Sequence, residues 1–298
     1  MQRRKFLSRM SLLALGTTTQ LDAFEFYSIE EKFRNFFSSS APKKTKPKNI
    51  IVDTPKTIIE KKPKIITTAE HKIIKKEKVV LDEKEFALLK DLHEHLKRVR
   101  YICGYGHFNL VGIDEMNKIA KDYSKVGKFT KKELALVERL FYEEASTYGF
   151  YGEKVLTNIS DNISNREITK IAHTGHYLFR GKPQEMYGQI RSELGSSVVL
   201  TSGVRSIIKQ LYLFINKAVK TKGDLSLASH SLAPVGYSYH GVGDFDVGKL
   251  GFGARNFTSA FSKTDEYKKL IDSGYIKIRY PKGNPYGVRF EPWHIKVV

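Results

Sequence analysis

The last eight residues constrain this chain more than any other segment, because Glu291, Pro292, Trp293 and His294 stand together just before an apolar end. Pro292 has no backbone N–H and biases Glu291 toward extended backbone, so the Glu-x-x-His pair cannot lie on one face of a helix. In an ideal strand, residues three apart point to opposite faces. The sequence therefore predicts a bulge or strand-end twist near Pro292 that brings both side chains to one site.

A second cluster lies about fifty residues upstream, in a glycine-rich loop that carries His240, Asp244 and Asp246. Two histidines and one aspartate form a three-ligand zinc set with a fourth position open for water, and a nearby unligated glutamate can deprotonate that water. Asp244 and Asp246 share a face if they lie on a strand, so the aspartate that misses the metal can orient a histidine instead. This combination predicts a hydrolase with a zinc site.

Three separated blocks of this sequence resemble the zinc D-alanyl-D-alanine carboxypeptidases of the VanY and VanX type. The first reads Ser-Gly-x-Arg-Ser over residues 202–206 with Gln210 downstream, the second runs from Leu232 to His240, and the third is residues 291–294. The Arg-Tyr-Pro-Lys-Gly run at 279–283 also resembles the closing hairpin of that family. The resemblance extends from about Thr169 to Val298.

The resemblance implies a role for each matching residue. It makes His240 and His294 zinc ligands, with Glu291 as the general base. Arg205 would face the substrate carbonyl, and Ser238 and Gln210 would lie beside the substrate. One departure concerns the third ligand, because the family usually places its aspartate seven residues after the first histidine, where this chain has Val247. Asp246, at six, is the preferred ligand, and Asp244, at four, is the alternative.

Hydrophobic periodicity and capping signals predict an α+β fold, in which a small antiparallel sheet with flanking helices carries the zinc site. We expect this domain over residues 166–298, preceded by a small helical module over residues 81–165. Asp82 with Glu85, and Thr130 with Glu133, are typical of helix N-termini. Further predicted elements are helices at 113–123, 206–220 and 264–273, a strand at 198–200, and a hairpin with strands at 275–280 and 287–290.

The remaining histidines give weaker signals. His173 and His176 have a metal-like spacing, but Gly175 interrupts any helix and no acidic partner follows, so both are assigned a structural role. His93, His95 and His230 are expected at solvated surface positions.

The N-terminal part of the chain indicates export followed by a tether. Arg3 and Arg4 before a short apolar stretch resemble a twin-arginine signal, assigned to residues 1–25 and directing the protein to the periplasm or cell envelope. Residues 26–80 form a Lys/Pro-rich linker, in which residues 41–80 hold 12 Lys against 4 acids, hence +8 of the formal +19. The linker is interpreted as a spacer, or as a basic arm contacting the membrane or an anionic wall polymer. Nucleic acid is excluded as a partner because the charge is concentrated in this tether and the folded part has no nucleic-acid motif.

Two classes of function follow from these patterns. The first is a zinc carboxypeptidase that removes the terminal D-alanine of peptidoglycan stem peptides, or an endopeptidase of the same fold that cuts another bond. The second is a non-catalytic peptidoglycan-binding or scaffolding protein, suggested by the shortened His-to-Asp spacing and the additional helical module.

Overall fold

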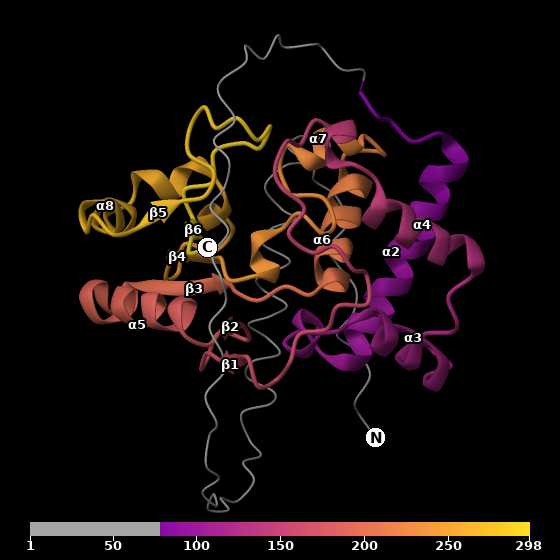
Figure 1. The fold of residues 1–298 in the computed structure, drawn as a ribbon, viewed down its shortest axis with the longest axis horizontal. Helices are drawn as coiled ribbons and strands as arrows, with labels where there is room; N and C mark the ends of the chain where they lie inside the picture. The colour runs from indigo at the N-terminus through magenta and orange to yellow at the C-terminus, as the bar shows by residue number, and fades with distance from the viewer. Residues whose placement is uncertain (1–77) are drawn as a thin grey trace, which may run out of the picture.

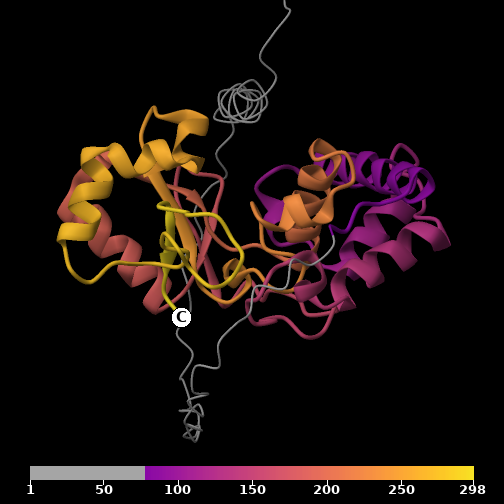
Figure 2. The ribbon, with the colours of Figure 1, turned by 90° about the horizontal axis from the view of Figure 1, so that it is seen from above.

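The computed structural model describes residues 78–298, which form an α+β fold of two lobes. Figures 1 and 2 show helices gathered on one side and a small sheet with its own helices on the other. The predicted export signal and nearly all of the predicted linker lie outside the described residues. Within residues 78–298, no helix is both long enough and apolar enough to span a bilayer.

The helical lobe begins with α2 (Glu83–Cys103), α3 (Ile113–Asp122) and α4 (Lys131–Tyr142). Asp82 caps α2 by accepting a hydrogen bond from the backbone N–H of Glu85, as predicted. Thr130 and Glu133 form the predicted capping box at the start of α4. Two later helices, α6 (Ile207–Lys220) and α7 (Leu225–Ser229), complete this lobe.

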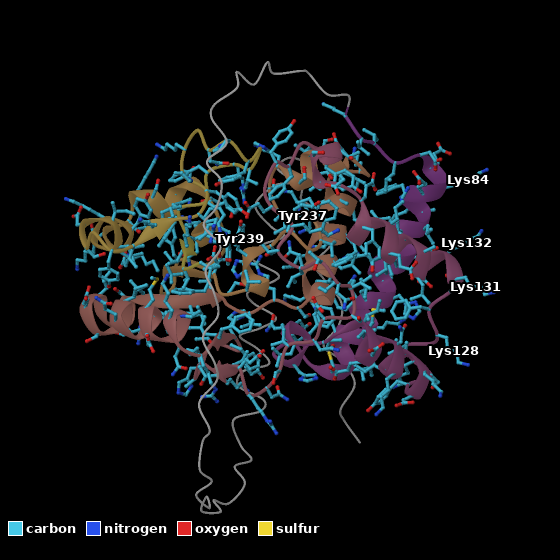
Figure 3. The ribbon with its side chains drawn as sticks, viewed as in Figure 1. Lys84, Lys128, Lys131, Lys132, Tyr237 and Tyr239 are labelled. Carbon is cyan, nitrogen blue, oxygen red and sulfur yellow. The ribbon has the colours of Figure 1, made fainter. Side chains whose placement is uncertain are left out.

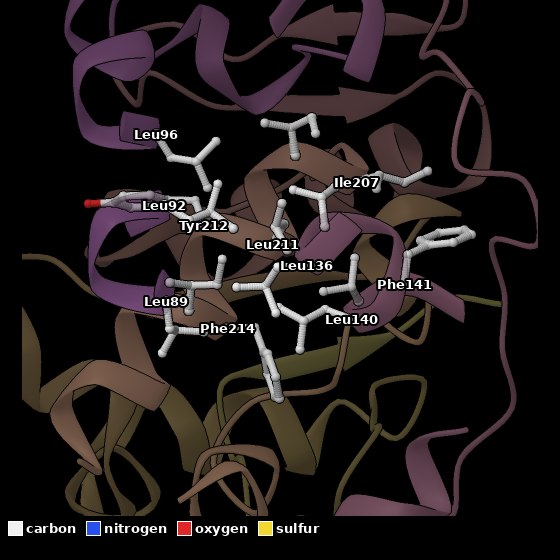
Figure 4. Packing of buried hydrophobic residues seen from close by; sticks show 14 of the residues in the cluster. Leu89, Leu92, Leu96, Leu136, Leu140, Phe141, Ile207, Leu211, Tyr212 and Phe214 are labelled. Atoms are coloured by element: carbon white, nitrogen blue, oxygen red, sulfur yellow. The ribbon is translucent and has the colours of Figure 1, made fainter. Parts of the chain in front are cut away.

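One hydrophobic core joins the early helices to α6, although more than sixty residues separate α4 from α6 and more than a hundred separate α2 from α6. Figure 4 shows leucines of α2 and α4 packed against Ile207, Leu211, Tyr212 and Phe214 of α6. These side chains are almost fully buried because they form the apolar face of α6, which packs against the helical lobe. The helical lobe and the segment that follows the first family-like block are therefore stabilised together.

The other lobe contains a four-stranded antiparallel sheet with the strand order β3-β4-β6-β5. Its strands are β3 (Val198–Ser202), β4 (Phe245–Lys249), β5 (Lys277–Ile278) and β6 (His294–Lys296). The helices α5 (Lys182–Leu194) and α8 (Asp265–Asp272) cover it, and a separate hairpin pairs β1 (Ile168–Lys170) with β2 (Tyr177–Phe179). Its core is a second cluster that includes Phe245, Trp293 and Ile295.

The prediction of a hairpin near the end of the chain is wrong for its second strand. The strand β5 pairs with β6, and residues 287–290 form no strand. The pairing continues past β5 as Arg279 N–H donates to the carbonyl of His294, and Glu291 N–H donates to the carbonyl of Tyr280. Gly287 explains the difference, since an added Cβ there would lie 2.0 Å from the carbonyl oxygen of Gly149, which shows a close approach of another loop.

The surface positions predicted for His93 and His95 are also wrong, because both rings are buried in the helical lobe. The Nδ1 atom of His95 lies 2.9 Å from the carboxylate of Glu133, and its Nε2 atom lies 2.8 Å from the carbonyl oxygen of Gly127. His93 stacks on Tyr212 of α6. Because α2 has many charged residues, its sequence gave no indication that the positions of His93 and His95 contact other helices. His230 is exposed, as predicted.

Lysines on the outer edge of the helical lobe point into solvent. Figure 3 shows Lys84, Lys128, Lys131 and Lys132 on that edge, whereas Tyr237 and Tyr239 lie between the two lobes. These lysines are therefore distant from the region where the lobes face one another.

Candidate metal site

The register of the four-stranded sheet brings the site together. Ser202 of β3 pairs with Asp246 of β4, and Asp246 pairs with His294 of β6. Directly opposed residues on antiparallel strands place their side chains on the same face about 5 Å apart. Residues more than ninety positions apart in the chain thus become neighbours across three strands.

The irregularity predicted near Pro292 is present as a turn directly before β6. The backbone N–H of His294 donates to the carbonyl of Glu291 at 3.2 Å, which closes this turn. The Glu291 Oε2 atom lies 3.1 Å from His294 Nδ1, so the two side chains share one site. Both are nearly buried.

His240 lies in the turn of 3-10 helix Tyr239–Gly241, and its ring is fully buried. Its Nδ1 atom is 2.8 Å from the carbonyl oxygen of Gly203. A carbonyl can only accept, so Nδ1 carries the hydrogen and the Nε2 lone pair is available to a metal. Gly203 must be glycine because an added Cβ would lie 2.0 Å from the carbonyl oxygen of Tyr177 on β2.

His294 is oriented the other way round from His240, because its Nε2 atom and not its Nδ1 atom contacts the supporting acceptor. Its Nε2 atom is 3.2 Å from Asp244 Oδ2, which leaves Nδ1 as the nitrogen that faces Asp246 and Glu291. Asp244 also accepts from Arg279 Nε at 2.6 Å and from the backbone N–H of Val297 at 2.8 Å. Asp244 is thus held at the back of the imidazole, on the side away from Asp246.

Three ligand atoms converge at one point. One atom each of His240, Asp246 and His294 lie within 4.8 Å of one another, and all three residues are buried. His240 Nε2 and Asp246 Oδ1 are 3.2 Å apart, and neither has a hydrogen bond to any described residue. Buried polar atoms without partners are rare, and two nitrogens with one carboxylate oxygen are ligands that suit zinc. The residues therefore fit a zinc ion.

The charges of the site favour ionised carboxylates. Burial would raise the pKa of Asp246, but the neighbouring His240 and Arg205 outweigh burial and hold that pKa at about 2. Burial opposes ionisation of Asp244 as well, yet hydrogen bonds from His294 and Arg279 keep its pKa well below the ordinary value. Burial, followed by the Arg205 charge, lowers the pKa of His240 to about 4, which leaves the imidazole neutral at pH 7.

The other predicted site residues line one cleft beside this triad. The cleft has a volume of about 670 Å³, and Arg205, Gln210, Ser238 and Glu291 all belong to its wall. The Arg205 Nη2 atom donates to Asp246 Oδ2 at 2.6 Å, and its Nε atom donates to Ser202. Arg205 therefore binds Asp246 Oδ2, and its side chain is also part of the cleft wall.

Sequence reasoning missed two residues in or beside the site. His176 received a structural role, but its ring lies in the cleft wall. Burial together with the charges of Lys209 and Arg205 lowers the pKa of His176 to about 3, so the ring is neutral. Arg279 was expected only as part of a hairpin, although it forms a buried ion pair with Asp244. No local signal identifies either residue, since the neighbours of both come from other segments of the chain.

Comparison with known protein families supports the sequence resemblance. Residues 181–298 match the family model of VanY, D-alanyl-D-alanine carboxypeptidase. The similarity to this family therefore covers the part of the chain that holds the four-stranded sheet and the candidate metal site. Comparison with curated proteins gave no match.

Three solved structures are similar to part of this chain. A mutant of the vancomycin-resistance D,D-pentapeptidase VanY from a VanB-type cassette, in complex with Zn(II), has 24% sequence identity, covering 44% of this chain and 78% of its own, with a TM-score of 0.36. VanYB in complex with D-alanine-D-alanine has 23% identity, with coverages of 48% and 85% and a TM-score of 0.36. The LD-carboxypeptidase LdcB has 24% identity, with coverages of 44% and 63% and a TM-score of 0.35.

Proposed function

We propose that this protein is a zinc-dependent carboxypeptidase that removes the terminal D-alanine from peptidoglycan stem peptides in the cell envelope. The observation that carries the proposal is the convergence of His240 Nε2, Asp246 Oδ1 and a nitrogen of His294 beside Glu291, in a cleft of a VanY-type domain. The shortened spacing after His240 does not prevent Asp246 from reaching this point. That observation favours the enzyme over a binding protein without a metal.

His240, Asp246 and His294 would hold the zinc ion, and Asp244 would fix the imidazole of His294 from behind. A bound zinc ion acidifies water to a pKa near 7 and polarises a carbonyl group. Asp244 is assigned this positioning role because it contacts the far nitrogen of His294, whereas Asp246 faces both histidines.

Glu291 is the general base of the proposed reaction. Its carboxylate is next to the ligand nitrogen of His294, within reach of a water molecule that attacks the scissile carbonyl. Glu291 accepts the proton of that water and then returns it to the leaving amine of D-alanine. Arg205 lies in the cleft wall beside Asp246, where its guanidinium would stabilise the negative charge that develops on the carbonyl oxygen.

Gln210 and Ser238 would contact the bound peptide. Both are buried residues of the cleft wall, and the Oε1 atom of Gln210 has no hydrogen bond to any described residue. Its Nε2 atom donates to the carbonyl of Ala233, which fixes the amide so that Oε1 is available as an acceptor for a substrate N–H.

The test is incubation of the zinc-loaded protein with pentapeptide stems, followed by mass spectrometry of the products. Loss of one D-alanine is expected, whereas loss of a dipeptide or cleavage of a crosslink would assign a different bond. Glu291→Gln should keep stoichiometric zinc and lose turnover by roughly 10²- to 10⁴-fold. A protein that binds muropeptides but holds no zinc would contradict the proposal and favour the scaffolding function.

A further inference from the structure

The hairpin formed by β1 and β2 contributes one polar side chain to the cleft that the proposed reaction does not use. His176 directly precedes β2 and lines the same cleft as Arg205 and Asp246. It lies before residue 181, where the match to the family model begins. Its Nδ1 atom is buried and has no hydrogen bond to any residue of the described part of the chain. The ring therefore has a free hydrogen-bonding position in the cleft.

The turn that carries His176 is fixed by hydrogen bonds on both sides of this residue. The backbone N–H of Ile171 donates to the carbonyl of His176 at 3.0 Å, and the backbone N–H of His176 donates to Thr174 Oγ1 at 3.1 Å. The carbonyl of Gly175 accepts from Asn109 Nδ2 of the helical lobe at 3.3 Å. The fold thus holds the backbone of His176 in one place and keeps its ring in the cleft wall.

The hairpin is also joined to the candidate metal site. The carbonyl of Tyr177 accepts from the backbone N–H of Val204 at 2.8 Å, and it packs against Gly203, whose own carbonyl contacts His240. Figure 1 shows β1 and β2 beside the end of β3. In the sheet, β4 lies between β3 and β6, and Glu291 precedes β6. The hairpin therefore approaches the triad from the β3 side, and Glu291 approaches it from the β6 side.

Thr201 provides a second polar group without a partner in the same cleft wall. The residue is only 8% exposed, and its Oγ1 atom has no hydrogen bond within residues 78–298. The register of β3 against β4 shifts between Leu200 and Ser202, so Thr201 lies at this irregularity. Buried polar groups are normally paired. Two that lack partners in one wall indicate that the cleft binds a polar ligand here.

The chemistry of these two groups limits the kind of ligand. Burial, followed by the charges of Lys209 and Arg205, keeps the pKa of His176 at about 3, so its ring is neutral. A neutral imidazole has one donor and one acceptor, and a hydroxyl group can act as either. The N–H and carbonyl of a peptide amide match such groups. At the scissile bond of the proposed substrate both residues are alanine, so only the main chain and its terminal carboxylate can form hydrogen bonds.

We infer that His176 forms a hydrogen bond with a main-chain amide of the bound peptide beside the scissile bond, with Thr201 Oγ1 as a second contact. This inference rests on the proposed function. A peptide that lies across the triad then has Glu291 on one side and His176 on the other. The hairpin is thereby a substrate-binding element that recognises peptide backbone and not a charged side chain.

The test removes and then restores the hydrogen-bonding groups of His176. His176→Phe keeps a ring but has no nitrogen, and it should lower kcat/KM for a pentapeptide stem by roughly tenfold, mainly through a higher KM. His176→Gln again offers a donor and an acceptor, and it should recover most of this loss. Both variants should retain stoichiometric zinc, because the ring is not one of the proposed ligands.

The matched control is His173→Asn, which removes an imidazole from the same turn. His173 is exposed and has a φ of 63°, a backbone conformation that asparagine tolerates. This variant should keep the kcat/KM of the unmodified protein. An unchanged kcat/KM in folded, zinc-loaded His176→Phe would overturn the inference. A loss that His176→Gln does not recover would also overturn it, because it would show that the ring acts only through the fold.

A measurement on the unmodified protein avoids the question of whether a variant folds. The full-length zinc-loaded protein is labelled with ¹⁵N-histidine, and the signals of the His176 ring are assigned by their loss in His176→Gln. Saturation with the tetrapeptide product should shift a ring nitrogen resonance of His176 but not those of His173. Unchanged His176 resonances would overturn the inference.

Failure of the proposed function can be separated from failure of this inference. If the pentapeptide is not cleaved, its binding to the same proteins is measured by calorimetry. Binding that is roughly tenfold weaker in His176→Phe and recovered in His176→Gln would support the contact while contradicting the carboxypeptidase activity. Equal affinity in all three proteins, or no binding to any of them, would overturn the contact.

Discussion

Replacement of Asp244 by asparagine tests how the candidate metal site is built. Asp244 is almost completely inaccessible, and its ion pair with Arg279 is buried, with Nε to Oδ2 at 2.6 Å and Nη2 to Oδ1 at 3.0 Å. Removal of one partner from a buried ion pair costs about 3–5 kcal/mol. Asparagine keeps one oxygen as an acceptor for Val297 N–H, so we expect the low end, about 3 kcal/mol. For a domain of this size that corresponds to roughly 6–12 °C in Tm.

The same substitution should weaken zinc binding without abolishing it. Asp244 contacts the back of His294, and loss of such an outer partner typically reduces metal affinity by about 10- to 100-fold. Asp246→Asn, in contrast, removes a proposed ligand and should eliminate stoichiometric zinc. The two variants are compared by thermal unfolding of the metal-free proteins and by zinc titration against a competing chelator.

Two further variants make this test specific. Asp244→Asn combined with Arg279→Met should recover part of the lost stability, since the unpaired buried charge is gone. Asp272→Asn on the exposed surface of α8 should change the free energy of unfolding by less than about 0.5 kcal/mol. The reasoning is refuted if Asp244→Asn loses zinc as completely as Asp246→Asn does, or if its Tm is unchanged.

Other predictions address zinc, backbone fit and pH. Saturation with zinc at about 1,000 times Kd should stabilise the protein by about 4 kcal/mol, and a chelator should reverse the gain in Tm. Gly203→Ala should lower both Tm and zinc content, because its Cβ would collide with the Tyr177 carbonyl and displace the acceptor of His240; wild-type values would contradict the tight fit. Glu133 has a pKa below its ordinary 4.5, because hydrogen bonds from Thr130 and His95 outweigh the opposing effect of burial. The ionised Glu133 therefore contributes its full stabilisation above about pH 4.5, and this stabilisation is lost as the pH falls through the lowered pKa. Glu133→Gln should make the Tm fall less steeply as the solution is acidified.

Much of the helical lobe could be predicted from local sequence signals. The caps at Asp82 and Thr130 and the apolar stripe of α2 depend on residues three or four apart, and such contacts form within a single helix. The burial of His93 and His95 could not be predicted in this way, because it depends on later segments of the chain. Tyr212 of α6 stacks on His93, whereas Glu133 of α4 and the carbonyl of Gly127 contact His95. A polar residue on a charged helix gives no indication of which partner will cover it.

The candidate site shows the same division. The residue types in three short blocks determined that two histidines, an aspartate and a glutamate would meet, and Pro292 determined that the last pair would lie in a turn. The loop after His240 left two aspartates open, because both would lie on one face of a strand. The pairing of β4 with β6 gives them different positions, since it puts Asp246 opposite His294 and leaves Asp244 behind the ring with Arg279.

The sequence by itself determined which chemical groups this protein has available, because ligand types, caps and turn residues act over a few positions. The tertiary structure alone decided which of those groups face one another. Register across the sheet put Asp246 beside His294, and the packing of α6 against the helical lobe placed Gln210 in the wall of the cleft. Contacts of that kind join segments that are far apart in the chain. Their geometry, and the entropic cost of bringing the segments together, are determined only by the complete fold.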